Sequence, residues 1–203
     1  MTQGSPALAM IELCSIAQGV IVHDALLKRA HVFVEWARVY NPGKYAIFIR
    51  GGEEEVSESL EEARRIAGAF EVDAIYLPLP HPQLIRSLAQ DGTSRDAKGH
   101  GGAEPAVGVI ECYSLCATLR AADRALKEAD LFALALRIDP TLGGKGCFMF
   151  TGALEDVEVG IEAGRAGAGP AFFYHAQHVA RPHGELPLGL VTEYPSPQDP
   201  RSL

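Results

Sequence analysis

Histidines are the residues of this chain whose grouping could carry metal or catalytic chemistry. His175, His178 and His183 lie close together in the sequence, and imidazole is a common zinc ligand. In the strand predicted here, side chains alternate between the two faces, so His175 and His178, three residues apart, point to opposite faces. His81 or His183 beside an acidic residue would suit a general base. Because no Ser-His-Asp, paired-carboxylate or Cys-His arrangement repeats, we expect neither a metal site nor an enzyme.

The four cysteines form no CxxC pair. Cys112 and Cys116 fall at the end of a predicted strand and in the next helix, which favours small apolar packing groups over iron–sulfur ligands. Cys14 and Cys147 stand alone, and we expect reduced, mostly buried thiols in a cytosolic protein. The segment Gly164–Pro170 follows a helix rather than a strand, so it lacks the context of a dinucleotide-binding loop and is predicted to stop that helix. We therefore expect no cofactor.

The composition is that of a globular chain with an acidic balance. Of the 203 residues, 47% are hydrophobic and 22% are charged, which is enough to bury a core. The 18 lysines and arginines and 26 acidic residues give a net charge of −8, which disfavours nucleic acids and anionic membranes as partners. We found no apolar run of membrane-spanning length, and the first residues lack the features of a signal peptide.

The elements that must position these side chains occur twice. A shift of 99 residues aligns Ala7–Arg38 with Ala106–Arg137, and ten of the 32 pairs are identical, where about two are expected by chance. The match continues at a shift of 101 and ends at a shift of 102, where Pro80-His81 aligns with Pro182-His183. We therefore predict a first domain at residues 5–90, a linker at 91–105, a second domain at 106–192 and an irregular tail at 193–203.

Each copy is predicted to have the order β-α-β-β-α-β-α. In the first copy, Ser15 could cap the first helix and Gly68 ends the second. The order indicates an α+β fold, a ferredoxin-like α/β sandwich of one sheet with helices on one face. Such units also bind small regulators, so a small-molecule-binding or regulatory protein with a ligand between the two repeats is the alternative function.

Three features together resemble the BMC domain of bacterial microcompartment shell proteins. A strand of pattern A-x-x-x-I-E leads into a helix of pattern D-x-x-x-K-x-A, and a hairpin follows that ends in R-G or T-G. The last strand ends in R-P-H in the second copy, whereas the first copy lacks the arginine. These motifs occupy Ala7–Glu12, Asp24, Lys28, Ala30, Arg50-Gly51 and Leu79-Pro80-His81, and again Ala106–Glu111, Asp123, Lys127, Ala129, Thr151-Gly152 and Arg181-Pro182-His183.

The resemblance covers about residues 7–88 and 106–188, and two fused copies resemble the tandem-domain, unpermuted class of that family. It implies a homotrimeric, pseudohexagonal tile of a shell in the cytoplasm, packed beside single-domain hexamers and pentamers around enzymes. It also implies a central pore for metabolites or cofactors, which is gated in some members. In some members two trimers stack face to face, and the sequence leaves that point open here.

The resemblance further assigns roles to particular residues. Lysines beside the pore loops would favour anions and Asp139 would disfavour them, while the longer, glycine-rich second loop could swing. Neither predicted pore loop contains a cysteine, which argues against electron transfer. The implied pore-lining residues are Tyr40, Asn41, Pro42, Gly43, Lys44, Asp139, Pro140, Thr141, Leu142, Gly143, Gly144 and Lys145. The implied tile-edge residues are Lys28, Lys127, Pro80, His81, Arg181, Pro182 and His183.

Overall fold

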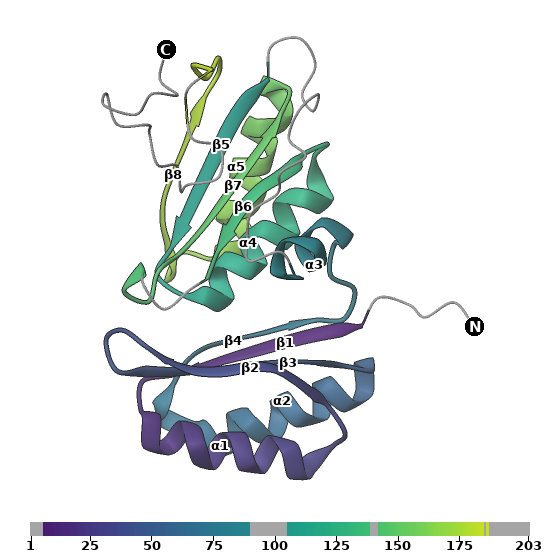
Figure 1. Ribbon diagram of the computed structural model, residues 1–203, viewed down its shortest axis with the longest axis vertical. Coiled ribbons are helices and arrows are strands. Elements are labelled where there is room, and N and C mark those ends of the chain that lie inside the picture. The colour runs from purple at the N-terminus through teal and green to yellow at the C-terminus, as the bar shows by residue number, and fades with distance from the viewer. Residues whose placement is uncertain (1–5, 90–104, 139–141, 185, 187–203) are drawn as a thin grey trace, which may run out of the picture.

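A computed structural model describes residues 6–89, 105–138, 142–184 and 186 of the chain. It contains two four-stranded antiparallel sheets, one in each half (Figure 1). The predicted linker, apart from its last residue, and the predicted tail lie outside the described residues.

The first domain has the predicted order of elements, with a short 3₁₀ turn before its last strand. Its strands lie in the sheet order β2-β3-β1-β4, so the first strand is central. Both helices after β1 and β3 cover the same face of this sheet (Figure 1). The elements are β1 (Ala7–Leu13), α1 (Ile16–Arg29), β2 (Phe33–Tyr40), β3 (Lys44–Gly51), α2 (Glu53–Ala67), η1 (Gly68–Phe70), β4 (Glu71–Leu77) and α3 (Pro82–Ala89).

The second domain repeats this arrangement, with the sheet order β6-β7-β5-β8. The fold class predicted from the duplication is therefore confirmed. A counterpart of α3 would follow Pro182-His183 and falls largely outside the described residues. The elements are β5 (Ala106–Cys112), α4 (Leu115–Glu128), β6 (Phe132–Arg137), β7 (Gly146–Gly152), α5 (Leu154–Ala168) and β8 (Phe173–Val179).

Local signals in the sequence explain where the helices begin and end. The Ser15 side chain accepts a hydrogen bond from the amide of Gln18, as an N-cap should, and Ser114 does the same for Ala117 at the start of α4. Helix α2 begins with three glutamates at the positive end of its dipole and ends at Gly68, as predicted. The serine caps that begin α1 and α4 are therefore the same in the two copies.

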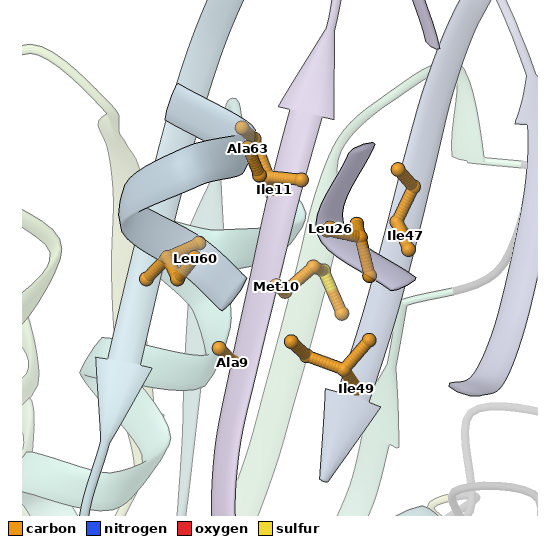
Figure 2. A pocket seen from close by; sticks show the side chains of 8 residues that line it. All are labelled: Ala9, Met10, Ile11, Leu26, Ile47, Ile49, Leu60 and Ala63. Atoms are coloured by element: carbon orange, nitrogen blue, oxygen red, sulfur yellow. The ribbon is translucent and has the colours of Figure 1, made fainter. Parts of the chain in front are cut away.

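The core of the first domain lies between its sheet and the helix pair α1 and α2. All seven residues of β1 are buried. Figure 2 shows aliphatic side chains from β1, β3 and both helices around one point of this core, and the space between them is too small for a water molecule. The first domain is therefore closely packed on its helical side.

The segment Gly164–Pro170, which is predicted to stop a helix, contains the end of α5. Helix α5 continues through Ala168 and ends at Gly169, which has a φ of 76°. Gly164 lies inside the helix, and a Cβ there would come within 2.4 Å of the Ile110 side chain. The glycine thus lets α5 approach the second sheet. Among the helices in the described ranges, none combines the length and apolar character needed to cross a membrane.

Candidate functional site

The two domains meet where helix α4 lies on the outer face of the first sheet, the face that α1 and α2 leave open (Figure 1). Leu8, Met10 and Phe48 of this face belong to one apolar cluster with Leu115 and Leu119 of α4. All five side chains are at most 4% exposed. This contact, called the domain junction below, is therefore filled by side chains in the manner of a protein interior.

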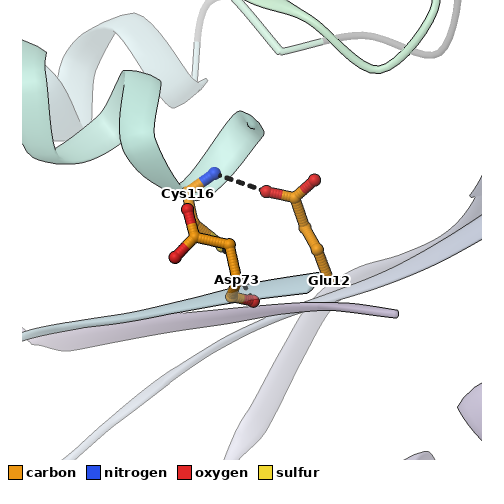
Figure 3. Close-up of side chains that lie close together, drawn as sticks. All are labelled: Glu12, Asp73 and Cys116. Carbon is orange, nitrogen blue, oxygen red and sulfur yellow. Dashed lines mark hydrogen bonds between the residues drawn. The ribbon is translucent and has the colours of Figure 1, made fainter. Parts of the chain in front are cut away.

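Polar groups join the two domains at the N-terminus of α4 (Figure 3). The amide of Cys116 donates to Glu12 Oε1 over 2.7 Å, and the Ser114 hydroxyl lies 2.8 Å from the same oxygen. Ser114 also contacts the carboxylate of Asp73, which is the cross-strand neighbour of Glu12. The two carboxylates therefore hold the positive end of the α4 dipole against the sheet.

Arg120, further along α4, supplies a cation to this cluster. Its guanidinium lies 2.8 Å from Asp73 Oδ2 and 3.0 Å from Oδ1, and it donates to the Ala74 carbonyl over 2.9 Å. The Asp73 side chain is 8% exposed and that of Arg120 is 26% exposed. Since a buried carboxylate without a cation is costly, Arg120 makes the burial of Asp73 possible.

Glu12, Asp73 and Cys116 place three potential metal ligands within 4.8 Å of one another. The two carboxylates already accept hydrogen bonds from hydroxyl groups, a helix amide and a guanidinium of this chain. Burial raises the pKa of the Cys116 thiol well above its usual value, so the sulfur stays protonated and is a poor metal ligand. The group is therefore a structural joint between the domains.

Helix α3 closes the other side of the domain junction. The His81 amide donates to Asp123 Oδ1 over 2.7 Å. The Gln83 side chain donates to the Leu131 carbonyl over 2.7 Å and accepts from the Ala133 amide over 2.9 Å. Burial lowers the pKa of His81, which favours its neutral form. These contacts tie the end of the first domain to α4 and β6 of the second.

The corresponding surface of helix α1 is open. Ile16, Val20 and Leu27 are 40%, 56% and 47% exposed. Their counterparts in α4, at the shift of 99 residues, are at most 5% exposed and are Leu115, Leu119 and Leu126. The chain thus covers this helix face in one copy and leaves it uncovered in the other.

The outer face of the second sheet is likewise open along β8. His175 and Gln177 are exposed at the positions where the first sheet buries Asp73 and Ile75. After the last strand, Leu186 is 37% exposed, whereas its counterpart Leu84 in α3 is 1% exposed. The α1 face and the β8 side of the second sheet therefore correspond to surfaces that are covered in the domain junction, and both are exposed here.

Charged and polar side chains form a row across this second sheet. Cys147 and His175 are each a cross-strand partner of Glu111, so the three lie side by side on β7, β5 and β8. Lys145 Nζ lies 3.8 Å from Glu111 and 4.1 Å from the centre of the Tyr174 ring. The row replaces the buried acidic pair of the first sheet with groups of both signs.

The two hairpin loops predicted to line a pore lie next to each other. A Cβ built on Gly144 would lie 3.0 Å from the Asn41 carbonyl oxygen and 3.5 Å from the Lys44 ammonium nitrogen. Gly143 and Gly144 have φ values of 62° and 83°, which favour glycine. The predicted pore residues Asp139, Pro140 and Thr141 lie outside the described residues.

The remaining pore candidates differ in exposure. Asn41, Pro42 and Gly43 are exposed, and Leu142 is 37% exposed. Tyr40 is buried, and its hydroxyl donates to Glu12 at the domain junction. Burial and the nearby Glu12 carboxylate raise the pKa of Tyr40, so the phenol keeps its proton. Tyr40 therefore connects the base of the first loop to the junction.

The predicted tile-edge residues lie at corresponding places in the two copies. Lys28 Nζ lies 2.6 Å from Asp24, and Lys127 Nζ lies 2.5 Å from Asp123. Pro80 is buried and His81 half-buried beside α4, whereas their counterparts Pro182 and His183 are half-buried and exposed, and Arg181 is exposed. The described chain by itself does not bring the two lysines into one site.

The cysteines and histidines occupy separate places. All four cysteines are free, and Cys14 is exposed, unlike the buried pair Cys112 and Cys116. Burial raises the pKa of Cys112 to about 11 and that of Cys147 to about 12, so neither is a ready thiolate at neutral pH. His178 lies 3.9 Å from Glu158 of α5, whereas His175 stands in the row on the outer face, so the two point apart as predicted.

Sequence reasoning missed three residues that hold the domain junction together, Arg120, Asp73 and Gln83. Identities between the two copies reveal the shared motifs, whereas Arg120 and Asp73 stand at positions where the two copies carry different residues. Arg120 aligns with Ile21 at the shift of 99, and Asp73 takes the position of His175 beside the matched glutamates. Paired changes of charge within a repeat were the available signal.

Comparisons with known proteins agree with the repeated fold. The family model described as the BMC domain matches residues 7–80 and 106–182. The bacterial microcompartment shell protein PduT of Citrobacter freundii is 28% identical over 183 residues, which is 90% of this chain and 96% of the relative. A crystal structure of a microcompartment protein from Desulfitobacterium hafniense DCB has a TM-score of 0.72 at 28% identity and covers 89% of this chain and 97% of its own.

A more distant structure shows the fold alone. The fused permuted hexameric shell protein MSM0275 from the RMM microcompartment has a TM-score of 0.59 at 18% identity. It covers 80% of this chain and 81% of its own.

Proposed function

The chain belongs to the BMC domain family and carries that domain twice, and we propose that it is a shell tile of a bacterial microcompartment in which three copies close into a ring. Such a ring has six domains and a pseudohexagonal outline. One observation carries the proposal: α4 covers the outer face of the first sheet, while α1 and strand β8 of the second sheet expose the corresponding residues.

A contact of this kind joins two different surfaces, a helix face and a sheet face. Repeated from chain to chain, it gives a ring if the rotation closes and a filament if it does not. Burial of Ile16, Val20 and Leu27, which are about half exposed, would contribute about 1 kcal/mol each. The hexagonal tiles of the family support closure after three chains.

The centre of the ring would be a pore lined by the hairpin loops. The contact between Gly144 and the Asn41 loop supports this, because loops that meet within the chain would stand around one axis in a ring. Lys44 lies beside this contact and would favour anionic metabolites or cofactors. Glycine at positions 143 and 144 would let the second loop change conformation and gate the pore, because glycine tolerates both positive and negative φ values.

At the rim, Lys28, Lys127, Arg181 and His183 would contact neighbouring tiles, including single-domain hexamers and pentamers of the same shell. The lysine side chains would pack through their stems and donate to carbonyl groups across the edge. As a tile in the shell, within the cytoplasm, the chain would have a structural role and would need no catalytic group or cofactor.

Native mass spectrometry and electron microscopy of the purified chain test this function. We expect the mass of three chains of 21.7 kDa each, or of six chains if two trimers stack. Electron micrographs should show flat particles with a central hole. A chain that stays monomeric at micromolar concentration, both alone and mixed with single-domain shell proteins, would contradict the proposal. The rim assignment has its own test: Lys28→Ala should reduce sheets of tiles and leave the trimer intact.

A further inference from the structure

The differences between the two copies at the contact surfaces come in pairs. On the sheet side, Glu12 and Glu111 correspond, but the cross-strand partner is Asp73 in the first sheet and His175 in the second. On the helix side, Arg120 of α4 corresponds to Ile21 of α1. The second contact thus keeps the glutamate but lacks the second acid on the sheet and the arginine on the helix that would pair with it.

We propose that α1 of one chain docks on the outer face of the second sheet of the next copy in the pose that α4 takes on the first sheet, with Ile21 against His175. Because Asp73 and Arg120 of the domain junction are replaced by His175 and Ile21 in this second contact, neither helix can take the place of the other. This inference rests on the ring proposed above and states which residues select the partner, a second copy of this chain.

The groups common to both contacts support the same pose. In the domain junction, Glu12 accepts from the amide of Cys116, the second residue of α4 after its cap. Helix α1 begins with the same serine cap, so Ala17 occupies the corresponding position. Glu111 stands on the second sheet where Glu12 stands on the first, so it can meet the positive end of α1 in the same way.

Wrong pairings are unfavourable in both directions. If α1 lay on the first sheet, Ile21 would cover Asp73 and Glu12 and leave two buried carboxylates without a cation. If α4 lay on the second sheet, Arg120 would meet His175, and Glu111 there already has Lys145 at 3.8 Å. Each sheet therefore accepts one helix and disfavours the other, which is specificity through repulsion as well as attraction.

The open positions are suited to a contact that forms between separate chains. Ile21 is 57% exposed and His175 is exposed, so substitutions there should leave the folded chain intact. Asp24 and Lys28 of α1 pair with each other, so α1 brings no unpaired charge from this turn toward His175. The exchange can therefore be reversed experimentally in the full chain.

The test rebuilds the charge pair of the domain junction between chains. Ile21→Arg alone should raise the dissociation concentration of the ring by about tenfold or more, because the added cation meets His175 in place of the aspartate of the domain junction, and the neighbouring Glu111 already has Lys145 at 3.8 Å. His175→Asp alone should also weaken the ring. The double variant Ile21→Arg, His175→Asp should return to within about threefold of the wild type and become more sensitive to salt. Sedimentation or mass photometry across a dilution series measures each value.

Val159→Arg is the matched control, since it also adds a cation at a half-exposed aliphatic position, on α5, and should leave the ring unchanged. A wild-type chain that forms no ring contradicts the proposed function itself. A ring that ignores Ile21→Arg, responds equally to Val159→Arg, or gains nothing in the double variant over the weaker single variant overturns this pose and leaves the tile proposal standing.

Discussion

The domain junction and the surfaces that repeat it differ in the forces they offer. In the junction, α4 is held by Arg120, by hydrogen bonds to Glu12 and by apolar burial. On α1, the same positions carry aliphatic side chains such as Val20 and Ile21, which are more than half exposed. The duplication has therefore produced one contact that adds a buried ion pair to apolar packing, and one helix surface that carries aliphatic side chains without that cation.

The covalent link between the domains explains why the polar contact lies within the chain. Bringing charged groups out of water opposes association, and a tether offsets this cost by raising the effective concentration of the partners. Separate chains have no such advantage, so a contact between them gains more from apolar area. The comparison teaches that a duplicated fold can place its buried ion pair in the contact between covalently connected domains, where the high effective concentration offsets the cost of desolvation.

The largest expected difference comes from a matched pair of truncations. Leu119→Ala should lower the free energy of unfolding by about 3 kcal/mol, because the side chain is 1% exposed in the junction. Val20→Ala, at the corresponding position of α1, should change it by less than about 0.5 kcal/mol and weaken the ring instead. Urea denaturation and sedimentation separate the two effects. Equal losses of folding stability would mean that the two surfaces are equivalent.

A smaller effect is expected from the ion pair of the junction. Arg120→Met keeps much of the side-chain length but leaves Asp73 buried without its cation, so the free energy of unfolding should fall by about 2 kcal/mol. The partial exposure of Arg120 keeps the loss below that of a fully buried pair. Asp73→Asn in the same background should recover part of the loss in urea denaturation. No recovery would show that Arg120 acts through packing alone.

Much of the fold could be predicted because its signals are local or repeated. The caps at Ser15 and the stop at Gly68 depend on nearby backbone groups, and the duplication aligns the strands of both sheets. The role of Gly164 could not be predicted, because this glycine serves a contact with Ile110, which lies 54 residues away in the sequence. A tertiary reason for a glycine cannot be read from its neighbours.

The site could be predicted less completely. The two hairpin loops were identified from the family pattern, and their contact through Gly144 is consistent with a common location. The junction residues Arg120 and Asp73 are 47 positions apart and lie in different domains. Their importance follows from what each copy lacks, namely a cation at Ile21 and an acid at His175, and pattern matching for identity passes over such changes.

The smallest expected effect concerns alkaline pH. Burial and the nearby Glu12 raise the pKa of the Cys116 thiol above its ordinary value near 9, so the folded chain keeps a proton that the unfolded chain releases. Above that pH the unfolded state binds fewer protons, and the free energy of unfolding falls as pH rises. Cys116→Ala removes this group and gives α4 the residue that α1 has at Ala17.

The variant should therefore lose less stability than the wild type between about pH 8 and pH 11 in urea denaturation. Tyr40 has a raised pKa as well, so part of the alkaline loss should remain. Cys14→Ala is the control, because that thiol is exposed and its removal should leave the slope unchanged. If the free energy of unfolding falls with pH equally in Cys116→Ala and in the wild type, the buried Cys116 thiol does not contribute to the alkaline loss of stability.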